Sequence, residues 1–302
     1  MPASRRTFIK NATLAVAGTT LFSKEIWGAN KSNELTGVQL YSVRDDMKKD
    51  PMATLREISR MGYKHVEHAN YVDRKFYGYG AKDFKKVLDD LGLKMPSGHT
   101  VMRKQHWDDT TRDFTDAWKY TVEDAATMGQ MYVISPSLDE NLRKNLDDLK
   151  RFLELFNKSG ELCKKSGMKF GYHNHDFEFR EKFGDVLMHD IILKNTDADL
   201  VIHQLDIGNL YNGGATAPEV LKKWPGRFQS MHVKDEIKAT SGNEPYESTK
   251  LGEGIVPVKE VIDAGRKSGG TIHFIIEQES YQGKSPLESV AEDLKIMKGW
   301  GY

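Results

Sequence analysis

Residues 168–175 read MKFGYHNH, a short apolar run that ends in His173, Asn174 and His175. Its length and its abrupt polar end are typical of a buried β-strand that runs into a functional loop. Seven further runs of this kind lie between residues 37 and 279. They are GVQLYSV (37–43), YKHVEHA (63–69), LKMPSGH (93–99), MYVISP (131–136), LVIHQLD (200–206), FQSMHVKD (228–235) and TIHFIIEQE (271–279).

Stretches with helical periodicity alternate with these runs. One opens at Asp50 with a proline in its first turn, another covers about 142–166, and the last begins at Ser285 with a capping box. No linker rich in Pro, Gly or Ser divides the chain. Eight strand–helix units of about 33 residues predict an α/β protein with a single (β/α)8 TIM barrel, in which eight parallel strands are surrounded by helices.

A doubly wound α/β sheet is the alternative fold. Two motifs that commonly bind nucleotide phosphates in such sheets are absent from the sequence. No GxGxxG follows the run at 37–43, and no GxxxxGK[ST] occurs anywhere. A nucleotide site of the common kinds is therefore not expected, and the barrel is favoured.

The first thirty residues look like an export signal rather than part of the fold. The segment SRRTFIK (4–10) precedes a small, apolar run at 11–22 and resembles the twin-arginine motif. That run is too short for a stable membrane span. We therefore expect a signal peptide over 1–30, cut near Ala29, and a barrel domain over 31–302, exported by the twin-arginine route to the periplasm. The alternative is a frayed basic terminus.

Composition narrows the class of partner. The 302 residues include 44 Lys plus Arg and 44 Asp plus Glu, so no strong net field favours nucleic acid or an anionic membrane. We expect a small-molecule partner, with no nucleic acid and no stable membrane anchor. Cys163 is the single cysteine and falls on the apolar face of the helix over 142–166, so we interpret it as a packing residue.

Polar residues gather where the predicted strands end. In a TIM barrel these ends form the active face. Six of the eight runs finish in His, Asp or Glu, and imidazoles with carboxylates are the ligands of a divalent cation. Each residue alone is more simply a polar group at a loop entrance; the set together favours a metal site. The candidates are Glu67, His68, His99, His173, Asn174, His175, Asp206, His232, Lys234, Asp235, Glu277 and Glu279.

Four segments resemble the sugar phosphate isomerase/epimerase superfamily with the xylose isomerase-like TIM barrel. They are LDIGN (205–209), MHVKD (231–235), LGEGIVP (251–257) and IIEQE (275–279), and the resemblance covers 36–300. It implies one divalent ion, such as Mn, Zn, Co or Mg, held by Asp206, His232 and Glu277. Barrels of this family often form dimers or tetramers, so a homo-oligomer is expected.

The fourth ligand departs from the family pattern. Relatives often have a glutamate where this chain has His173, which we interpret as the fourth metal ligand, with Glu178 as a fallback. Family epimerases use two metal-bound glutamates to move a proton between the two faces of a sugar. With Glu277 as the one clear base, the sequence favours a one-base reaction through an enediolate.

The remaining catalytic roles follow from this interpretation. His175 or His99 is a second proton carrier, and Lys234 stabilises the oxyanion or fixes a substrate oxygen. Glu67 either accepts from a substrate hydroxyl or orients a ligand, unless it pairs with a loop arginine. His203 is interpreted as a core histidine, and the polar stretch 238–250 as a mobile lid.

The leading hypothesis is a metal-dependent isomerase or epimerase that acts on a non-phosphorylated sugar or keto-sugar. The alternative is a lyase or hydratase on a 3-keto-glycoside or related keto-sugar, which the one-base argument favours. An alternative of another class is a periplasmic sugar-binding protein without catalysis. The superfamily is also similar to endonuclease IV enzymes, but the zero net charge and the export signal speak against DNA.

Overall fold

The computed structural model describes residues 35–240 and 245–302. The predicted signal peptide, residues 1–30, lies outside the described residues, and so do residues 241–244 of the predicted lid. Among the described helices, none has the length and apolar character needed to cross a bilayer.

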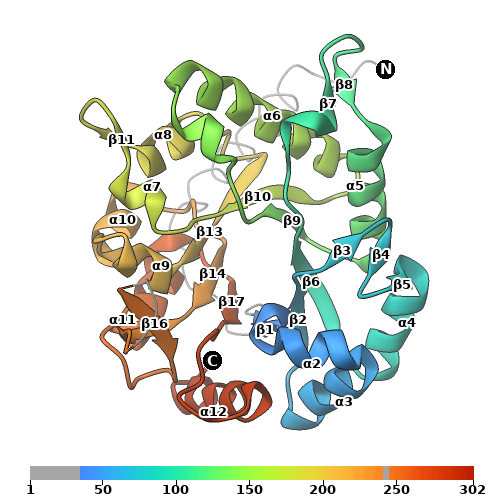
Figure 1. Ribbon diagram of the computed structural model, residues 1–302, viewed down its shortest axis with the longest axis vertical. Coiled ribbons are helices and arrows are strands. Elements are labelled where there is room, and N and C mark those ends of the chain that lie inside the picture. The colour runs from blue at the N-terminus through green and yellow to red at the C-terminus, as the bar shows by residue number, and fades with distance from the viewer. Residues whose placement is uncertain (1–34, 241–244) are drawn as a thin grey trace, which may run out of the picture. The chain divides into compact units, whose positions relative to one another are not determined.

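Parallel strands close into an eight-stranded barrel in the described part of the chain, so the predicted (β/α)8 fold is confirmed (Figure 1). Each strand pairs with its neighbours in sequence, and β1 pairs with β17 to close the ring. The barrel strands are β1 (Leu35–Gln39), β2 (His65–His68), β6 (Lys94–His99), β9 (Tyr132–Ser135), β10 (Lys169–His173), β13 (Val201–Asp206), β14 (Ser230–Val233) and β17 (His273–Ile276).

All eight predicted strands exist, and their bounds differ from the prediction mainly at the ends. The run at 37–43 changes most, because β1 ends at Gln39 and the chain continues as the 3-10 helix η2 (Leu40–Val43). Strand β10 ends at His173, so His175 lies beyond the strand rather than on one of its faces.

Helices follow each barrel strand and cover the outside of the ring. The longer ones are α3 (Pro51–Met61), α4 (Ala81–Asp90), α5 (Asp116–Met128), α6 (Leu146–Lys164), α8 (Met188–Lys194), α10 (Ala217–Lys223), α11 (Val258–Ala264) and α12 (Pro286–Gly299). The short ones are α2 (Arg44–Lys49), α7 (Phe177–Arg180), α9 (Ile207–Asn212), η3 (Lys104–His106), η4 (Glu140–Arg143) and the π-helix η5 (Gly265–Gly269).

Capping side chains set the helix starts. The Asp50 carboxylate accepts from the backbone N–H of Ala53, and Ser285 forms the predicted capping box with Glu288. The helix predicted over 142–166 begins later, at Leu146, because Asn145 accepts the N–H groups of the next turn. Residues Glu140–Arg143 form the separate helix η4.

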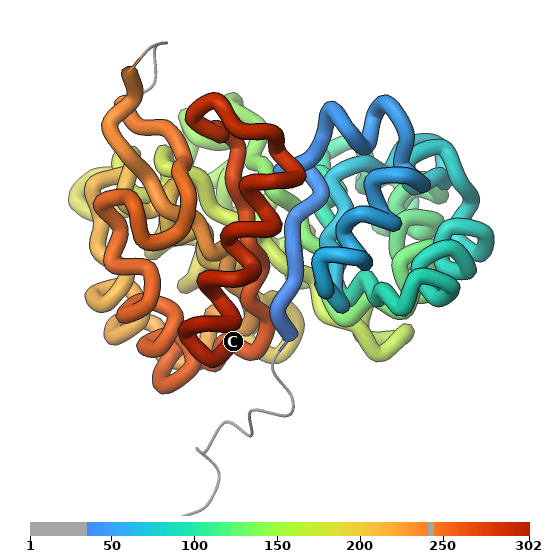
Figure 2. The backbone as a smooth tube through the Cα atoms, turned by 90° about the horizontal axis from the view of Figure 1, so that it is seen from below, coloured from blue at the N-terminus to red at the C-terminus, as the bar shows by residue number. Residues whose placement is uncertain are grey.

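An apolar layer lies between the helices and the outer face of the strands. Phe156 and Cys163 of α6 are fully buried in one cluster with Phe170 of β10, so the packing role predicted for the cysteine is confirmed. The first and last units meet where the ring closes. There β1 pairs with β17, and α12 contacts η2 and α3; the blue and red segments of Figure 2 are these two ends of the chain.

Hairpins extend the loops at the C-terminal ends of the strands. They are β3 (Tyr71–Val72) with β4 (Lys75–Phe76) and β5 (Tyr79–Gly80), β7 (Trp107–Asp108) with β8 (Asp113–Phe114), β11 (Lys182–Phe183) with β12 (Val186–Leu187), and β15 (Asp235–Lys238) with β16 (Tyr246–Thr249). The last of these contains most of the stretch predicted to be a lid. Among its described residues, Lys238 and Tyr246–Thr249 belong to paired strands rather than to an irregular loop.

The buried Asp235 carboxylate holds the glycine-rich loop that follows β16. Its two oxygens accept the backbone N–H groups of Gly252 and Gly254 at 2.9 Å and of Val256 at 3.0 Å. These contacts explain why the segments MHVKD and LGEGIVP occur together. They also give Asp235 a structural role, outside the metal cluster that we expected at the strand ends.

Replacing Gly254 with alanine tests this arrangement. An added Cβ would lie 2.2 Å from Asp235 Oδ1 and 2.4 Å from the Glu236 carbonyl oxygen, so the loop must shift away from its acceptor. We expect Gly254→Ala to lower the free energy of unfolding by about 2 kcal/mol, measured by urea denaturation. Gly299→Ala is the control, since a Cβ there meets nothing within 4 Å. Equal stability of the two variants would contradict the prediction.

Candidate active site

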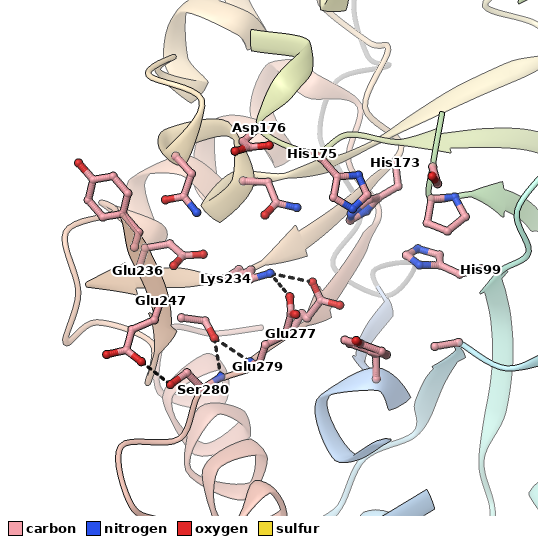
Figure 3. Close-up of a pocket in the computed structure, with 18 of the residues that line it drawn as sticks. His99, His173, His175, Asp176, Lys234, Glu236, Glu247, Glu277, Glu279 and Ser280 are labelled. Atoms are coloured by element: carbon pink, nitrogen blue, oxygen red, sulfur yellow. Dashed lines mark hydrogen bonds and ion pairs between the residues drawn. The ribbon is translucent and has the colours of Figure 1, made fainter. Parts of the chain in front are cut away.

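A cavity of about 860 Å³ opens at the C-terminal ends of the barrel strands. Its lining includes most of the catalytic residues predicted from the sequence, and Figure 3 shows their side chains turned toward this space. The predicted residues that line it are His99, His173, His175, Lys234, Glu277 and Glu279. Its volume lies within the range of about 300–1,000 Å³ for small-molecule sites.

Three predicted metal ligands come together at the base of this cavity. The ligand atoms of Asp206, His232 and Glu277 lie within 4.8 Å of one another, and all three side chains are buried. His232 Nδ1 is 3.2 Å from Glu277 Oε2 and 3.9 Å from Asp206 Oδ2. Two ligands of one tetrahedral ion at ordinary bond lengths are about 3.4 Å apart, so the spacing suits a shared divalent cation.

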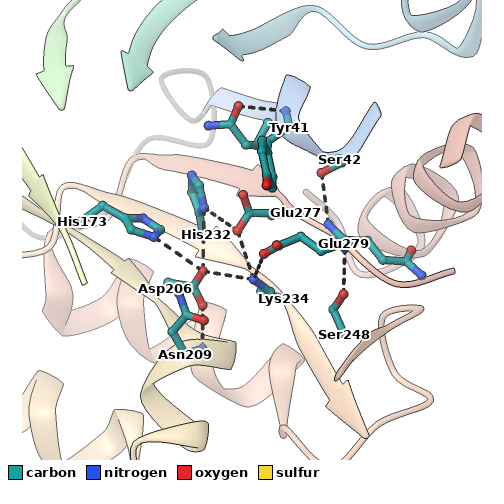
Figure 4. Close-up of polar contacts among 12 residues, drawn as sticks. Tyr41, Ser42, His173, Asp206, Asn209, His232, Lys234, Ser248, Glu277 and Glu279 are labelled. Atoms are coloured by element: carbon teal, nitrogen blue, oxygen red, sulfur yellow. Dashed lines mark hydrogen bonds and ion pairs between the residues drawn. The ribbon is translucent and has the colours of Figure 1, made fainter. Parts of the chain in front are cut away.

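His173 stands beside this cluster. Figure 4 shows His173 and Glu277 on opposite sides of Asp206, and His173 Nε2 is 3.8 Å from Asp206 Oδ2. That carboxylate oxygen is buried and has no hydrogen-bond partner, although its sister oxygen accepts from the Asn209 backbone. A buried oxygen without a donor is costly. A cation at this point would satisfy it, so the residues present fit a metal ion.

Glu67 lies deeper than the cavity, in the centre of the barrel. It is fully buried and acts on the metal cluster through His232, whose Nε2 is 2.6 Å from Glu67 Oε1. A carboxylate in this position orients a metal-binding imidazole. This contact matches the ligand-orienting role, one of the two considered for Glu67, and its partners include no arginine. They are Gln39 Nε2 at 2.7 Å, Ser97 Oγ at 2.5 Å, Gln204 Nε2 at 2.9 Å, His99 Nε2 at 3.2 Å and His232.

The Glu67–His232 contact is charged in the absence of a cation. Burial by itself would raise the pKa of Glu67, but the imidazoles of His99 and His232 outweigh burial and hold that pKa far below its usual range. Burial likewise opposes the charged form of His232, yet Glu277 and Glu67 raise its pKa to about 10. A divalent cation therefore competes with a proton on His232.

Lys234 balances the carboxylates at the edge of the cluster. Its Nζ lies 3.3 Å from Glu277 Oε2 and 3.8 Å from Asp206 Oδ2, and it also donates to Glu279. Although burial disfavours the ammonium, these carboxylates raise the pKa of Lys234. Burial raises the pKa of Asp206 to about 7, against the opposing effect of Lys234. The site thus holds one fixed cation next to the ligands.

His99, the last residue of β6, and His175, just beyond the end of β10, both line the cavity. The His175 ring packs on Phe177, and its Nδ1 has no hydrogen-bond partner. Burial, and then Lys234, lower the pKa of His175, so its imidazole is neutral at pH 7. His99 is turned inward, where its Nε2 is 2.7 Å from Gln204 Oε1.

Other predicted residues lie outside the ligand cluster. Glu178 accepts from the Tyr172 hydroxyl and the His175 backbone, so it shapes the loop and is not placed to replace His173 as a ligand. Asn174 bonds the backbone of Asp206 on the neighbouring strand. His68 is packed against Phe76. His203 is buried against Thr196, so the core role predicted for it is confirmed.

Three residues of the site were not found from the sequence. Tyr41 and Glu236 line the cavity, and Gln204 lies directly beneath it. Gln204 carried a usable signal, because it precedes Asp206 by two residues and therefore faces the same side of β13. Tyr41 lies in the 3-10 helix η2, which was predicted as a continuation of the first strand.

Known proteins support this description of the fold. An inosose dehydratase from Clostridium perfringens is 26% identical over 271 residues, which cover 81% of this chain and 88% of that protein. The crystal structure of a sugar phosphate isomerase/epimerase from Parabacteroides distasonis has a TM-score of 0.73 and 26% identity, covering 88% of this chain and 94% of the other. The zinc-bound IolI structure has a TM-score of 0.69 at 14% identity, covering 88% and 97%.

A family model connects these relatives to the chain. The model described as xylose isomerase-like TIM barrel matches residues 55–300, which include every predicted metal ligand. The chain therefore belongs to the xylose isomerase-like TIM barrel family.

Proposed function

We propose that this protein is a divalent-metal-dependent lyase that eliminates a β-substituent, such as water, from a cyclic keto-sugar through an enediolate. The observation that carries the proposal is the pairing of Glu277 with His173 across Asp206 (Figure 4). One carboxylate and one imidazole leave a single carboxylate base, whereas epimerisation by the family route needs a carboxylate on each face. The inosose dehydratase relatives support the same choice.

Glu277 is the proposed base. Although burial opposes its ionised form, Lys234 and His232 hold the pKa of Glu277 well below its usual value, so it is a carboxylate at neutral pH. It takes the proton from the carbon next to the ketone, and the electron pair moves onto the ketone oxygen. Lys234 lies 3.3 Å from Glu277 and stabilises the negative charge that develops on that oxygen.

Expulsion of the β-substituent completes the reaction. The enolate re-forms the carbonyl while the bond from the β-carbon to oxygen breaks, and the departing oxygen takes a proton to leave as water or an alcohol. His175 is the proposed proton carrier, because it lines the cavity as a neutral imidazole without a fixed partner at Nδ1. One ring nitrogen accepts the proton that Glu277 removed, while the other donates its proton to the departing oxygen, so that both residues end in their starting state. A cation held by His173, Asp206, His232 and Glu277 supplies Lewis acidity toward the substrate oxygens.

The space beside the catalytic cavity supports a substrate with more than one ring. A second cavity of about 850 Å³ lies between the loops after β2 and β6. It shares Ala69, His99 and Val101 with the catalytic cavity, so the two adjoin. A 3-keto-glycoside would place its keto ring at Glu277 and its second ring in this space. A monocyclic inosose would fill the first cavity alone.

Product analysis tests the function. The metal-loaded protein is incubated with an inosose and with a 3-keto-glycoside, and the products are followed by mass spectrometry and by the ultraviolet absorption of a conjugated ketone. We expect loss of water from the first, or of the alcohol from the second. An isomeric product of unchanged mass would favour the isomerase or epimerase alternative. Binding without any turnover would favour the sugar-binding alternative.

Glu277→Gln tests the base. We expect kcat to fall by about 10²–10⁴ because proton removal from carbon is lost. Metal content is measured alongside, since the amide oxygen still offers a ligand atom. The control is Glu57→Gln, which removes an exposed carboxylate paired with Arg60 on α3. A metal-loaded Glu277→Gln protein with wild-type kcat would exclude Glu277 as the base.

Metal affinity should rise with pH. In the metal-free protein His232, with a pKa of about 10, holds a proton throughout this range, and Asp206, with a pKa of about 7, is mostly protonated at pH 6 and mostly ionised at pH 8. Any proton on these groups must leave when a cation binds. We expect tighter Zn²⁺ or Co²⁺ binding at pH 8 than at pH 6, with net proton release. Calorimetry in buffers of different ionisation enthalpy measures both. Affinity that is unchanged over this range would contradict the ligand assignment.

We also propose that the protein acts after export by the twin-arginine route to the periplasm. The motif at 4–10 supports this location. A free or glycosidic sugar is then a more suitable substrate than a phosphorylated one. Fractionation of cells that produce the full chain, with and without Arg5→Lys and Arg6→Lys together, tests the route.

A further inference from the structure

Gln204 lies at the centre of the hydrogen-bond network beneath the cavity. Its side chain is fully buried, and every polar position of its amide is used. The oxygen Oε1 is 2.7 Å from His99 Nε2 and 3.0 Å from His173 Nδ1. The nitrogen Nε2 donates to Glu67 Oε2 at 2.9 Å and to Ser230 Oγ at 3.0 Å.

Glu67 determines which way this amide points. An ionised carboxylate accepts hydrogen bonds and has none to donate. Rotating the amide by half a turn would set the oxygen of Gln204 against Glu67 and its NH₂ group against the two imidazoles. The observed orientation is therefore the one that satisfies the buried carboxylate, and it leaves Oε1 facing His99 and His173.

An amide oxygen that only accepts fixes the proton positions on both imidazoles. A neutral imidazole has one N–H group and one nitrogen with a free lone pair. His173 must donate from Nδ1 and His99 from Nε2 to make the two contacts with Gln204. The lone pair of His173 is therefore on Nε2, the atom that lies 3.8 Å from the unpartnered Asp206 Oδ2.

We propose that Gln204 is a positioning residue that fixes His173 as its Nδ1–H tautomer and thereby makes Nε2 a ligand for the divalent cation. The first half rests on the geometry of the amide, and the second half rests on the metal site of the proposed function. The arrangement explains how an imidazole serves where relatives carry a glutamate. A lone pair is presented at the site without an added charge, and the amide beneath it prevents the other tautomer.

The tautomer is measured first, in wild-type protein stripped of metal. Proton–nitrogen NMR of histidine side chains labelled with a nitrogen isotope distinguishes Nδ1–H from Nε2–H rings, and His173→Ala and His99→Ala assign the two signals. We expect His173 as the Nδ1–H form and His99 as the Nε2–H form. Finding His173 as the Nε2–H form would overturn the proposal, whatever reaction the enzyme catalyses.

Gln204→Met then removes the amide at similar side-chain volume. We expect the His173 signal to shift toward a mixture of tautomers, and Zn²⁺ or Co²⁺ affinity to fall by about 10–100-fold. The visible spectrum of the Co²⁺ protein reports whether the imidazole still binds. The control is Gln130→Met, a buried glutamine at the opposite end of the barrel whose amide nitrogen has no hydrogen-bond partner. A Gln204→Met protein with wild-type tautomer and affinity would contradict the proposal.

A double-mutant cycle shows whether Gln204 acts through His173. In a His173→Ala background we expect most of the affinity loss caused by Gln204→Met to disappear, because the ligand it positions is already absent. An undiminished loss would assign the effect to another route and overturn the proposal. If no variant and no wild-type protein binds a divalent ion, the proposed function fails, while the NMR result still decides the tautomer.

Discussion

The buried carboxylate of Glu67 is the constraint on which the rest of the site depends. A charge in the centre of a barrel is tolerated only when donors surround it, and here the donors come from four other strands or their ends: Gln39, Ser97, Gln204 and His232. The same contacts that neutralise the charge fix the orientation of these side chains. The hydrogen bonds that stabilise the buried charge in the barrel core therefore also orient the side chains beneath the cavity.

The site is organised in two levels that share this charge. The lower level is a hydrogen-bond network of fully buried polar groups, and the upper level holds the ligand atoms of Asp206, His232, Glu277 and His173 around one unpartnered oxygen. Each imidazole has two nitrogens. The hydrogen bond that one nitrogen donates to the lower network therefore leaves the lone pair of the other nitrogen facing the predicted metal site. The proposed one-base elimination depends on the predicted metal ligands of the upper level. The orientation of those ligands depends on the hydrogen bonds of the lower level.

Much of this protein could be predicted from residue order. The eight runs and their polar ends were enough for the barrel, because strand length and a helix after each strand leave few alternatives, and the strand ends of a barrel converge on one face. The predicted ligands Asp206, His232 and Glu277 were chosen in this way, and their ligand atoms lie together. Errors arose where a run continued past the true strand end, as at residues 40–43 and at His175, since apolar composition alone does not mark the last ladder hydrogen bond.

Sequence by itself determined the fold, the family resemblance and the identity of the groups at the strand ends, because these depend on local pattern and on period-two alternation. Only the tertiary structure decided what each group touches. Glu67 and Asp235 are both carboxylates near strand ends. Side-chain donors enclose Glu67 beneath the predicted metal ligands, whereas Asp235 accepts three backbone N–H groups of a loop. That difference arises from contacts between residues far apart in the chain, such as Glu67 and Gln204, which no local pattern encodes.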